Sequence, residues 1–439
     1  MWKKAVKAAA FVLIFCLLFY AFSSVLATTG DYRNYQWVRG FYAEKRDTLD
    51  AVYIGSSTCY AYWNPLVGWD DFGIAVYPYA TNAQHFVATE YLIREVRKTQ
   101  PNAVIIVNTN TIDDSRMSVI TQHNLLDYMP FSLNKLQLTK YLCDTAGLTP
   151  EERLELYFPM YRYHSRWNEL RFADFNYRLD GMKGVSSYPA YRNMVTDVSG
   201  MYAHDEGAGE LPEYVRTAAE SLMDYCEKEH VRILFVTVPR VESEARLRQI
   251  NTLNGMIEAR GFDTLNMIER PELLGLDLTQ DFYNEGHTNI HGSLKYTRYL
   301  AGYLMEHYGL TDKRGDSRYA SWDKACAQYA STLNAYTLDI ERYPSRRTDA
   351  LARPEQVTVT EAGGAVRVAW SPVNGADGYL VWRRQGEKAW EPAGDTAETA
   401  LTDTAGGVDW YYTVVPYQGS GEDRAYGRFD YHCVPPKSD

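Results

Sequence analysis

Short apolar runs alternate with segments of helical periodicity over much of the chain. The runs are rich in β-branched residues and bounded by turn residues, as expected of buried strands in a parallel sheet. They cover residues 50–55, 74–77, 103–107 and 232–238, and residues 262–267 are expected to form an edge or final strand. Apolar residues every three or four positions predict helices over residues 85–98, 211–230, 242–260, 291–308 and 321–340. This alternation predicts an α/β domain with a parallel sheet.

Residues from about 113 to 210 interrupt this alternation. They are aromatic and charged, as in the run from Tyr157 to Trp167, and glycine-rich near residues 200–209. We predict that they form a large insertion over the strand ends, where binding loops usually lie.

The pattern changes again near residue 350. Short segments of alternating polarity, separated by glycine and proline turns, predict a small all-β sandwich over residues 354–437. Its strands are expected at residues 356–360, 365–370, 378–383, 400–403 and 410–417. Residues 341–353 then form a linker, and residues 31–340 form the α/β domain.

The amino terminus carries a membrane signal within residues 1–30. Lys3, Lys4 and Lys7 precede an uncharged stretch from Ala8 to Ala27, whose about 20 residues give roughly 30 Å as a helix, enough to cross a bilayer. The lysines favour a cytoplasmic amino end, so the rest of the chain lies outside. We expect a single-pass protein of the cell membrane with extracytoplasmic domains. The alternative is a secreted protein, because Val25-Leu26-Ala27 is an acceptable signal-peptidase site.

Composition narrows the classes of partner. A chain of 439 residues with 46% hydrophobic and 23% charged residues suits two or three globular domains. A net charge of −11 argues against nucleic acid, whose binders carry basic surfaces. The 6 cysteines form no C-x-x-C pair and are too sparse for a disulfide scaffold.

Candidate chemistry lies at the ends of the predicted strands. Ser57 follows the first strand, at the edge where open parallel sheets place their sites. A serine hydroxyl needs a base to remove its proton, and His287, in the loop before a late helix, is the obvious one. His287 and His291 are four residues apart, but H-E-x-x-H is missing, so we expect no metal site.

These residues stand in motifs that resemble those of the SGNH (GDSL-like) hydrolases. Gly55-Ser56-Ser57 resembles the first block, whose Gly-x-Ser supplies the nucleophile, and the segment ending in His287 resembles the last block. The run Val107-Asn108-Thr109-Asn110 is similar to the third block, whose asparagine lines the oxyanion hole. The resemblance covers about residues 45–310 and implies a flavodoxin-like, three-layer SGNH domain.

The resemblance implies a role for each residue. Ser57 is the nucleophile and His287 the base, while the Ser57 N–H, the region of Ala80 and Thr81, and Asn110 form the oxyanion hole. The family places a carboxylate three residues before the histidine.

The sequence departs from the family pattern at three places. Asn284 stands at the carboxylate position, so either Asn284 or Asp281 orients the imidazole. The second-block glycine is missing from residues 80–84, and Asn108 replaces the third-block glycine.

In its membrane anchor the chain resembles the branch that modifies surface polymers beside membrane-bound O-acyltransferases. The resemblance implies a serine esterase or O-acyltransferase without a cofactor, acting on acyl esters of a cell-surface polysaccharide or envelope polymer. The alternative is a non-catalytic SGNH scaffold that binds the polysaccharide or an acyltransferase. A third reading is an adhesin in which the β-sandwich matters most.

The carboxyl-terminal segment resembles a fibronectin type III domain. Trp370 stands at the position of the core tryptophan, followed by Ser371-Pro372 and by Tyr379 in the next strand. The run from Trp410 to Val414 is similar to the F strand, with Trp410 at the tyrosine-corner position. We expect this domain to serve spacing or adhesion, since a sandwich fold carries no function by itself.

Overall fold

The computed structural model describes most of the chain, in two compact units that are treated separately below. The described residues are 2–27, 32–113, 117–188, 205, 207–277, 280–337, 346, 348, 350–386 and 388–427. The first unit comprises residues 1–186, 202–274 and 297–325. The second comprises residues 187–201, 275–296 and 326–439. The predicted linker lies largely outside the described residues.

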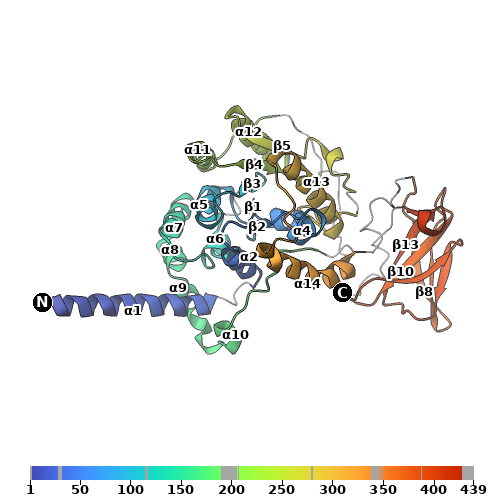
Figure 1. The fold of residues 1–439 in the computed structure, drawn as a ribbon, viewed down its shortest axis with the longest axis horizontal. Helices are drawn as coiled ribbons and strands as arrows, with labels where there is room; N and C mark the ends of the chain where they lie inside the picture. The colour runs from blue at the N-terminus through green and yellow to red at the C-terminus, as the bar shows by residue number, and fades with distance from the viewer. Residues whose placement is uncertain are drawn as a thin grey trace. The chain divides into compact units, whose positions relative to one another are not determined.

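A parallel five-stranded sheet forms the centre of the first unit (Figure 1). Its order is β2-β1-β3-β4-β5, and every residue of the first four strands is buried. The strands are β1 (Ala51–Gly55), β2 (Val76–Ala80), β3 (Val104–Asn108), β4 (Ile233–Thr237) and β5 (Asp263–Asn266). The prediction of an α/β architecture with a parallel sheet is confirmed.

Helices cover both faces of this sheet. Helices α5, α11 and α12 lie on one face and α4 on the other, as right-handed crossovers require (Figure 1). The predicted helices are present as η1 (Phe86–Ala88) with α5 (Thr89–Thr99), α11 (Glu213–Lys228), α12 (Glu244–Ala259), α13 (Ile290–Tyr308) and α14 (Ala320–Tyr336). Two short 3₁₀ helices, η4 (Pro271–Leu273) and η5 (Ser317–Tyr319), lie between them.

Two further helices between β1 and β2 have no counterpart in the sequence prediction. They are α3 (Ser57–Tyr62) and α4 (Pro65–Phe72). The Asn64 side chain starts α4 by accepting from the N–H groups of Leu66 and Val67, both at 3.1 Å. Gly73, with φ of 70°, ends it.

The insertion after β3 carries its helices between residues 119 and 175, and the described residues 176–188, 205 and 207–210 are in no helix or strand. Residues 114–116, 189–204 and 206 lie outside the described part. Its elements are α6 (Val119–Leu126), α7 (Leu133–Thr145), α8 (Pro150–Tyr157), α9 (Pro159–Tyr163), η3 (His164–Asn168) and α10 (Phe172–Phe175). Asp127 links the end of α6 with α9. Its carboxylate accepts from His123 Nδ1 at 2.9 Å and from the Tyr163 hydroxyl at 2.7 Å. Burial raises the pKa of the Tyr163 phenol, which stays a donor.

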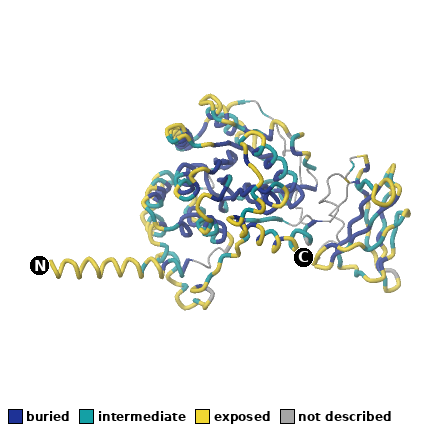
Figure 2. The backbone as a smooth tube through the Cα atoms, viewed as in Figure 1, coloured by how far each residue is buried: buried dark blue, intermediate teal, exposed yellow. Residues whose placement is uncertain are grey.

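The amino-terminal helix α1 (Trp2–Ala27) is long and apolar enough for a membrane span or a signal sequence. It is exposed along most of its length, while its last turns are covered (Figure 2). Ser23, Leu26 and Ala27 are buried in the first unit. A second helix, α2 (Tyr32–Ala43), follows it.

The second unit contains separate antiparallel sheets. One has the order β11-β10-β13-β14 and the other β12-β9-β8, and a core that includes Trp370, Tyr379 and Tyr412 joins them. The strands are β8 (Thr358–Ala362), β9 (Ala365–Ala369), β10 (Gly378–Arg384), β11 (Glu391–Thr396), β12 (Ala400–Asp403), β13 (Tyr411–Gln418) and β14 (Ala425–Tyr426), with η8 (Gly421–Asp423) before the last. Tyr412, two residues after Trp410, donates its hydroxyl to Asp403 at 2.8 Å. The prediction missed β11 and β14.

Candidate functional site

The strand order places a topological switch between β1 and β3. The chain leaves β1 towards β2 on one side, and continues from β3 to β4 and β5 on the other. In such sheets the connections diverge at the carboxyl ends of the two central strands and leave a crevice there. The residues that follow Gly55 and Asn108 therefore stand at the edge where this fold class places its ligands.

Ser57 is the hydroxyl presented at the end of β1. Every residue from Ala51 to Trp69, all of them described, is buried except Ser57. The neighbouring Ser56 is fully buried, and its Oγ lies 3.4 Å from Thr58 Oγ1. Ser57 is also the first residue of α3, which holds it on a regular element. Of the two serines, only Ser57 is accessible to a substrate.

Gly55 allows this turn to pack tightly against β3. A Cβ atom at residue 55 would lie 2.3 Å from Cys59 Sγ and 2.9 Å from Asn108 Cβ. Any side chain at residue 55 would force α3 and β3 apart, so glycine is required for the close approach.

Buried amides connect the ends of β1, β3 and β4. Thr58 donates to Asn108 Oδ1 at 3.2 Å, and Asn108 Nδ2 donates to Asn110 Oδ1 at 3.2 Å. Asn110 accepts from the Val238 N–H at 2.9 Å and donates to the Val238 carbonyl at 3.2 Å. A second contact runs from Asn110 Nδ2 to Glu242 Oε1 at 3.4 Å. Asn110 Nδ2 can donate to an oxyanion only if it gives up its bond to the Val238 carbonyl or to Glu242. The place of Asn110 in the oxyanion hole stays a prediction.

From the sequence, Asn108 stood out only because it replaces the third-block glycine, and Thr58 was not a candidate. Together they form the buried polar link between β1 and β3. The signal that could have found Asn108 is an amide directly after a β-branched run, where a buried strand end must satisfy its polar groups.

The loop after β2 is held from several sides. Ala80 and Thr81 are buried. The Asn82 N–H donates to Asn34 Oδ1 at 2.9 Å, and its carbonyl accepts from Asn124 Nδ2 at 2.9 Å. Ala83 has φ of 55°, in the left-handed region that glycine prefers. The loop thus keeps a glycine-like conformation in the segment that lacks the second-block glycine.

His287 belongs to the second unit, in the hairpin of β6 (Phe282–Asn284) and β7 (His287–Thr288). The two strands pair Asn284 with His287 across a turn. His287 Nδ1 lies 2.8 Å from Asn284 Oδ1, which also accepts from the Gly286 N–H at 3.0 Å. Since the amide oxygen only accepts, Nδ1 carries the hydrogen and the lone pair is on Nε2. A neutral imidazole in this tautomer is arranged to act as a base.

Asp281 is engaged elsewhere in the same unit. Its carboxylate accepts from Lys295 Nζ at 2.7 Å and from the Asp277 N–H at 2.5 Å, and its carbonyl accepts from the Asn289 N–H at 2.9 Å. These bonds tie the hairpin to the start of α13. Of the two candidate orienting residues, the structure brings Asn284 to the imidazole.

The ring of Tyr188 lies beside the imidazole. Tyr188 and Tyr283 stack with ring centroids 4.1 Å apart, and the Tyr188 ring lies 5.9 Å from that of His287. The Tyr188 carbonyl accepts from the Ile290 N–H at 2.8 Å. Ser57 and His287 belong to different units, so their approach to each other stays a prediction.

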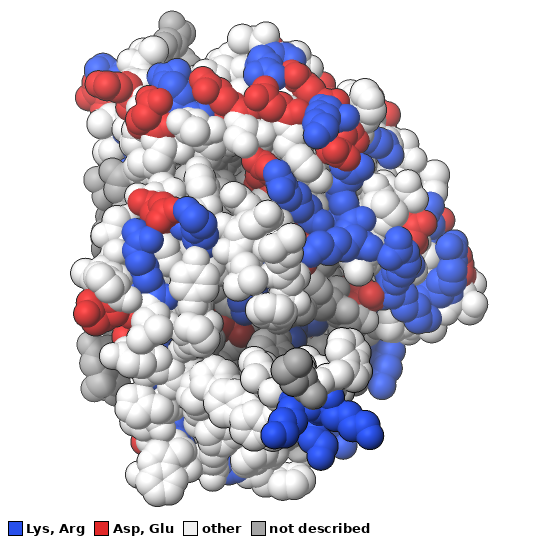
Figure 3. Space-filling model, turned by 90° about the vertical axis from the view of Figure 1, so that its left-hand side faces the viewer, with Lys and Arg blue, Asp and Glu red and all other residues white. Residues whose placement is uncertain are grey.

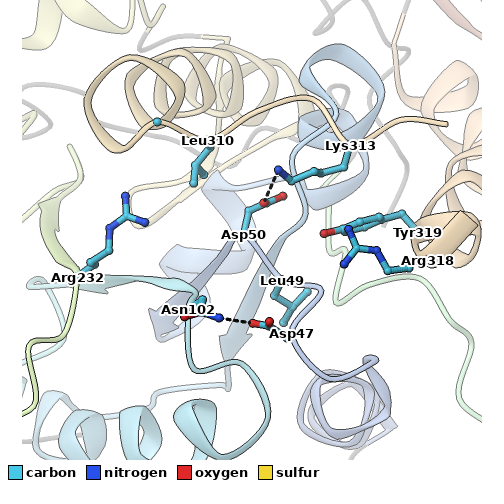
Figure 4. Close-up of a pocket in the computed structure, with 10 residues that line it drawn as sticks. Asp47, Leu49, Asp50, Asn102, Arg232, Leu310, Lys313, Arg318 and Tyr319 are labelled. Carbon is cyan, nitrogen blue, oxygen red and sulfur yellow. Dashed lines mark hydrogen bonds and ion pairs between the residues drawn. The ribbon is translucent and has the colours of Figure 1, made fainter. Parts of the chain in front are cut away.

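A cavity of about 310 Å³ lies at the other edge of the sheet (Figure 4). Its lining includes Asp50 before β1, Asn102 before β3 and Arg232 before β4. Lys313 Nζ lies 3.8 Å from the Asp50 carboxylate, and Asn102 donates to Asp47 at 2.9 Å. Burial raises the pKa of the Asp50 carboxyl. This edge is opposite the carboxyl ends of β1 and β3, where Ser57 and Asn108 lie, so we do not assign the reaction to it.

Within the described part of the chain, no group of three or more His, Cys, Asp or Glu side chains is arranged to hold a metal ion. No family model matches the sequence, and no curated protein matches it. One solved structure with a match is an Fn3-like protein from Clostridium thermocellum. It is 20% identical and covers 18% of this chain and 88% of its own, with a TM-score of 0.15. A match at that score carries no functional argument.

Proposed function

We propose that this protein is an extracytoplasmic serine esterase or O-acyltransferase of the SGNH type. Its substrates are acyl esters of cell-surface polysaccharides or other envelope polymers. The observation that carries the proposal is the exposure of Ser57, the single accessible residue in the buried segment from Ala51 to Trp69, at the carboxyl end of the central strand.

The fold is consistent with this assignment. The order β2-β1-β3-β4-β5 is the flavodoxin-like order, in which the ligand site lies at the β1/β3 switch. The two antiparallel sheets of the second unit, with Trp370 in their core, are consistent with a fibronectin type III-like domain.

In the proposed reaction, Ser57 Oγ attacks the acyl carbonyl and His287 Nε2 takes its proton. The oxyanion accepts hydrogen bonds from the Ser57 N–H, the Ala80–Thr81 region and Asn110. The intermediate collapses when the bond between the acyl carbon and the sugar oxygen breaks. The imidazolium gives its proton to that oxygen, which departs as a hydroxyl and leaves an acyl ester on Ser57. Water or a second sugar hydroxyl then attacks this ester, again with His287 as base, and restores the enzyme.

Asn284 holds the imidazole without supplying a negative charge. It fixes the tautomer through the 2.8 Å bond but stabilises the imidazolium less than a carboxylate would. The lack of a carboxylate at residue 284 favours the alternative function, a non-catalytic SGNH scaffold that binds the polymer or an acyltransferase partner.

We also propose that α1 is a retained membrane anchor. Cleavage after Ala27 would remove Ser23, Leu26 and Ala27, which are buried against the first unit. The Arg166 guanidinium donates to the Leu26 carbonyl and fixes this end of the helix. A signal peptide destined for removal has no need of such packing.

The test uses the full chain in detergent, treated with a fluorophosphonate probe and assayed with an aryl acetate. We expect the probe to label Ser57, and Ser57→Ala to abolish both labelling and hydrolysis. Ser56→Ala is the matched control, since it removes a buried hydroxyl one residue away and should leave both unchanged. Absence of labelling, or equal labelling of Ser57→Ala, would contradict the catalytic proposal and leave the binding scaffold.

A further inference from the structure

Exposed apolar side chains are concentrated in the insertion. Outside α1, all large exposed apolar side chains of the described residues lie between residues 120 and 175, except Val408. We call this set the apolar face: Ile120, Phe131, Leu133, Leu154, Tyr157, Phe158, Tyr161, Trp167, Phe172 and Phe175. Phe172 is 79% exposed, Leu133 71% and Trp167 69%. Monomeric proteins rarely expose so many large apolar groups together without a partner for them.

The apolar face is joined to the end of α1. The ring centroids of Phe158 and Phe19 are 6.1 Å apart, and those of Phe131 and Tyr20 are 6.2 Å apart. The Phe131 N–H also donates to the Tyr20 hydroxyl at 3.3 Å. These contacts fix the level of Phe131 and Phe158 along the axis of α1.

That level lies within the membrane that α1 would span. Lys7 is the last charged residue of α1, and a hydrocarbon core of about 30 Å needs roughly 20 residues beyond it. Phe19 comes only 12 residues after Lys7, about 18 Å along the helix. If the Lys7 side chain snorkels by a whole turn of about 5 Å, Phe19 still lies inside the core. Phe131 and Phe158, which contact Phe19 and Tyr20, then lie in the outer half of the bilayer.

The chemistry of the face suits a lipid surface. The phenylalanines and leucines are purely apolar, while Trp167, Tyr157 and Tyr161 have the amphipathic rings that concentrate at membrane interfaces. Figure 3 shows the side of the molecule from which α1 projects: the lower part of this surface is largely uncharged apart from one basic cluster, and most charged residues gather in its upper part.

We propose that the apolar face enters the outer leaflet of the membrane that α1 spans, so that the insertion is a second membrane contact. The occupant is the lipid bilayer itself. The inference depends on the proposed retention of α1 as an anchor, but no step in it depends on esterase activity.

The test places spin labels on the full chain in phosphatidylcholine vesicles. Cysteines are introduced singly at Phe131 in the apolar face, at Phe15 in α1 and at Ala245, an exposed position in α12. The background replaces Cys16, Cys326 and Cys433 by alanine and keeps the buried Cys59, Cys143 and Cys226. Power saturation in paramagnetic resonance then measures accessibility to oxygen, which enters lipid, and to a nickel chelate, which stays in water.

We expect the labels at residues 15 and 131 to be several-fold more accessible to oxygen than to nickel, and the label at residue 245 to show the reverse. A lipid-like signal at residue 15 with a water-like signal at residue 131 would overturn the inference and leave the anchor intact. The face would then belong to a protein partner. Water-like signals at both positions would refute the anchor and the inference together.

Discussion

Replacing Asn284 by aspartate tests how the imidazole of His287 is held. The carboxylate has nearly the same shape as the amide, and one oxygen can keep both bonds that Asn284 Oδ1 makes, to His287 Nδ1 at 2.8 Å and to the Gly286 N–H at 3.0 Å. The change therefore adds a negative charge beside Nδ1 without a new geometry. That charge stabilises the imidazolium formed when Ser57 attacks.

The expected gain follows from the strength of this hydrogen bond. A neutral bond contributes about 1 kcal/mol and a bond to a charged group about 1.5–3 kcal/mol, so the variant gains about 0.5–2 kcal/mol in the transition state. At about 1.4 kcal/mol per factor of ten, this is roughly a 2- to 30-fold rise in rate. Asn284 and His287 are both partly exposed, and solvent screening limits the gain to this range.

The assay is kcat/KM for an aryl acetate as a function of pH, on the full chain and on Asn284→Asp. Besides the higher plateau, we expect the acidic limb of the profile to move to higher pH, because the added carboxylate favours the protonated imidazole. Asp281→Asn is the matched control, since it removes a charge from the same hairpin at a residue paired with Lys295 at 2.7 Å. It should lower the melting temperature and leave the pH profile in place.

An Asn284→Asp variant with an unchanged rate and an unchanged profile would refute the assignment of His287 as the base. A gain of roughly 10⁴-fold, the scale of a buried serine-protease triad, would instead favour the binding scaffold as the natural function.

Two further predictions concern stability. Gly55→Ala should lower the free energy of unfolding in urea by about 1–3 kcal/mol. Adding Cys59→Ala should restore only part of this loss, because the contact with Asn108 Cβ at 2.9 Å remains. A double variant whose loss equals the sum of the losses of the two single variants would contradict this. Burial lowers the pKa of Lys135 in the folded chain to about 8, from its ordinary value of 10.5. Below pH 8 the buried ammonium therefore lowers the free energy of unfolding, and this cost disappears as the pH rises from 8 towards 10.5. Lys135→Met should therefore be about 2 kcal/mol more stable at pH 7, less so towards pH 10, whereas a pH-independent difference in thermal unfolding would contradict the reasoning.

The central strands could be predicted because their physical signal is local. Residues 103–107 and 233–236 are unbroken apolar runs, and a strand buried on both faces needs nothing else. Helices α3 and α4 were not predicted because most of their residues are buried, so no polar face marks the helical period. The insertion helices were not predicted for the opposite reason, since exposed apolar residues such as Leu133 and Phe172 stand where a water-facing helix would carry polar groups.

The candidate site was predictable residue by residue but not in its contacts. A glycine, a serine and a histidine can be located by spacing, whereas the choice between Asp281 and Asn284 depends on the turn of the hairpin. The β6–β7 pairing places Asn284 directly opposite His287, while Asp281 meets Lys295 from the following helix. That information lies in backbone register, which no local pattern of residue types specifies.

The burial of Ser23, Leu26 and Ala27 limits where the protein can work. On the proposal that α1 is retained as a membrane anchor, this packing holds the first unit close to the bilayer, without a flexible linker between them. The proposed active site would then reach only a thin layer at the membrane surface, which it would cover by lateral diffusion. If the proposed function is right, polymer strands farther from the membrane become substrates only when they are newly made, or when another component brings them to the membrane.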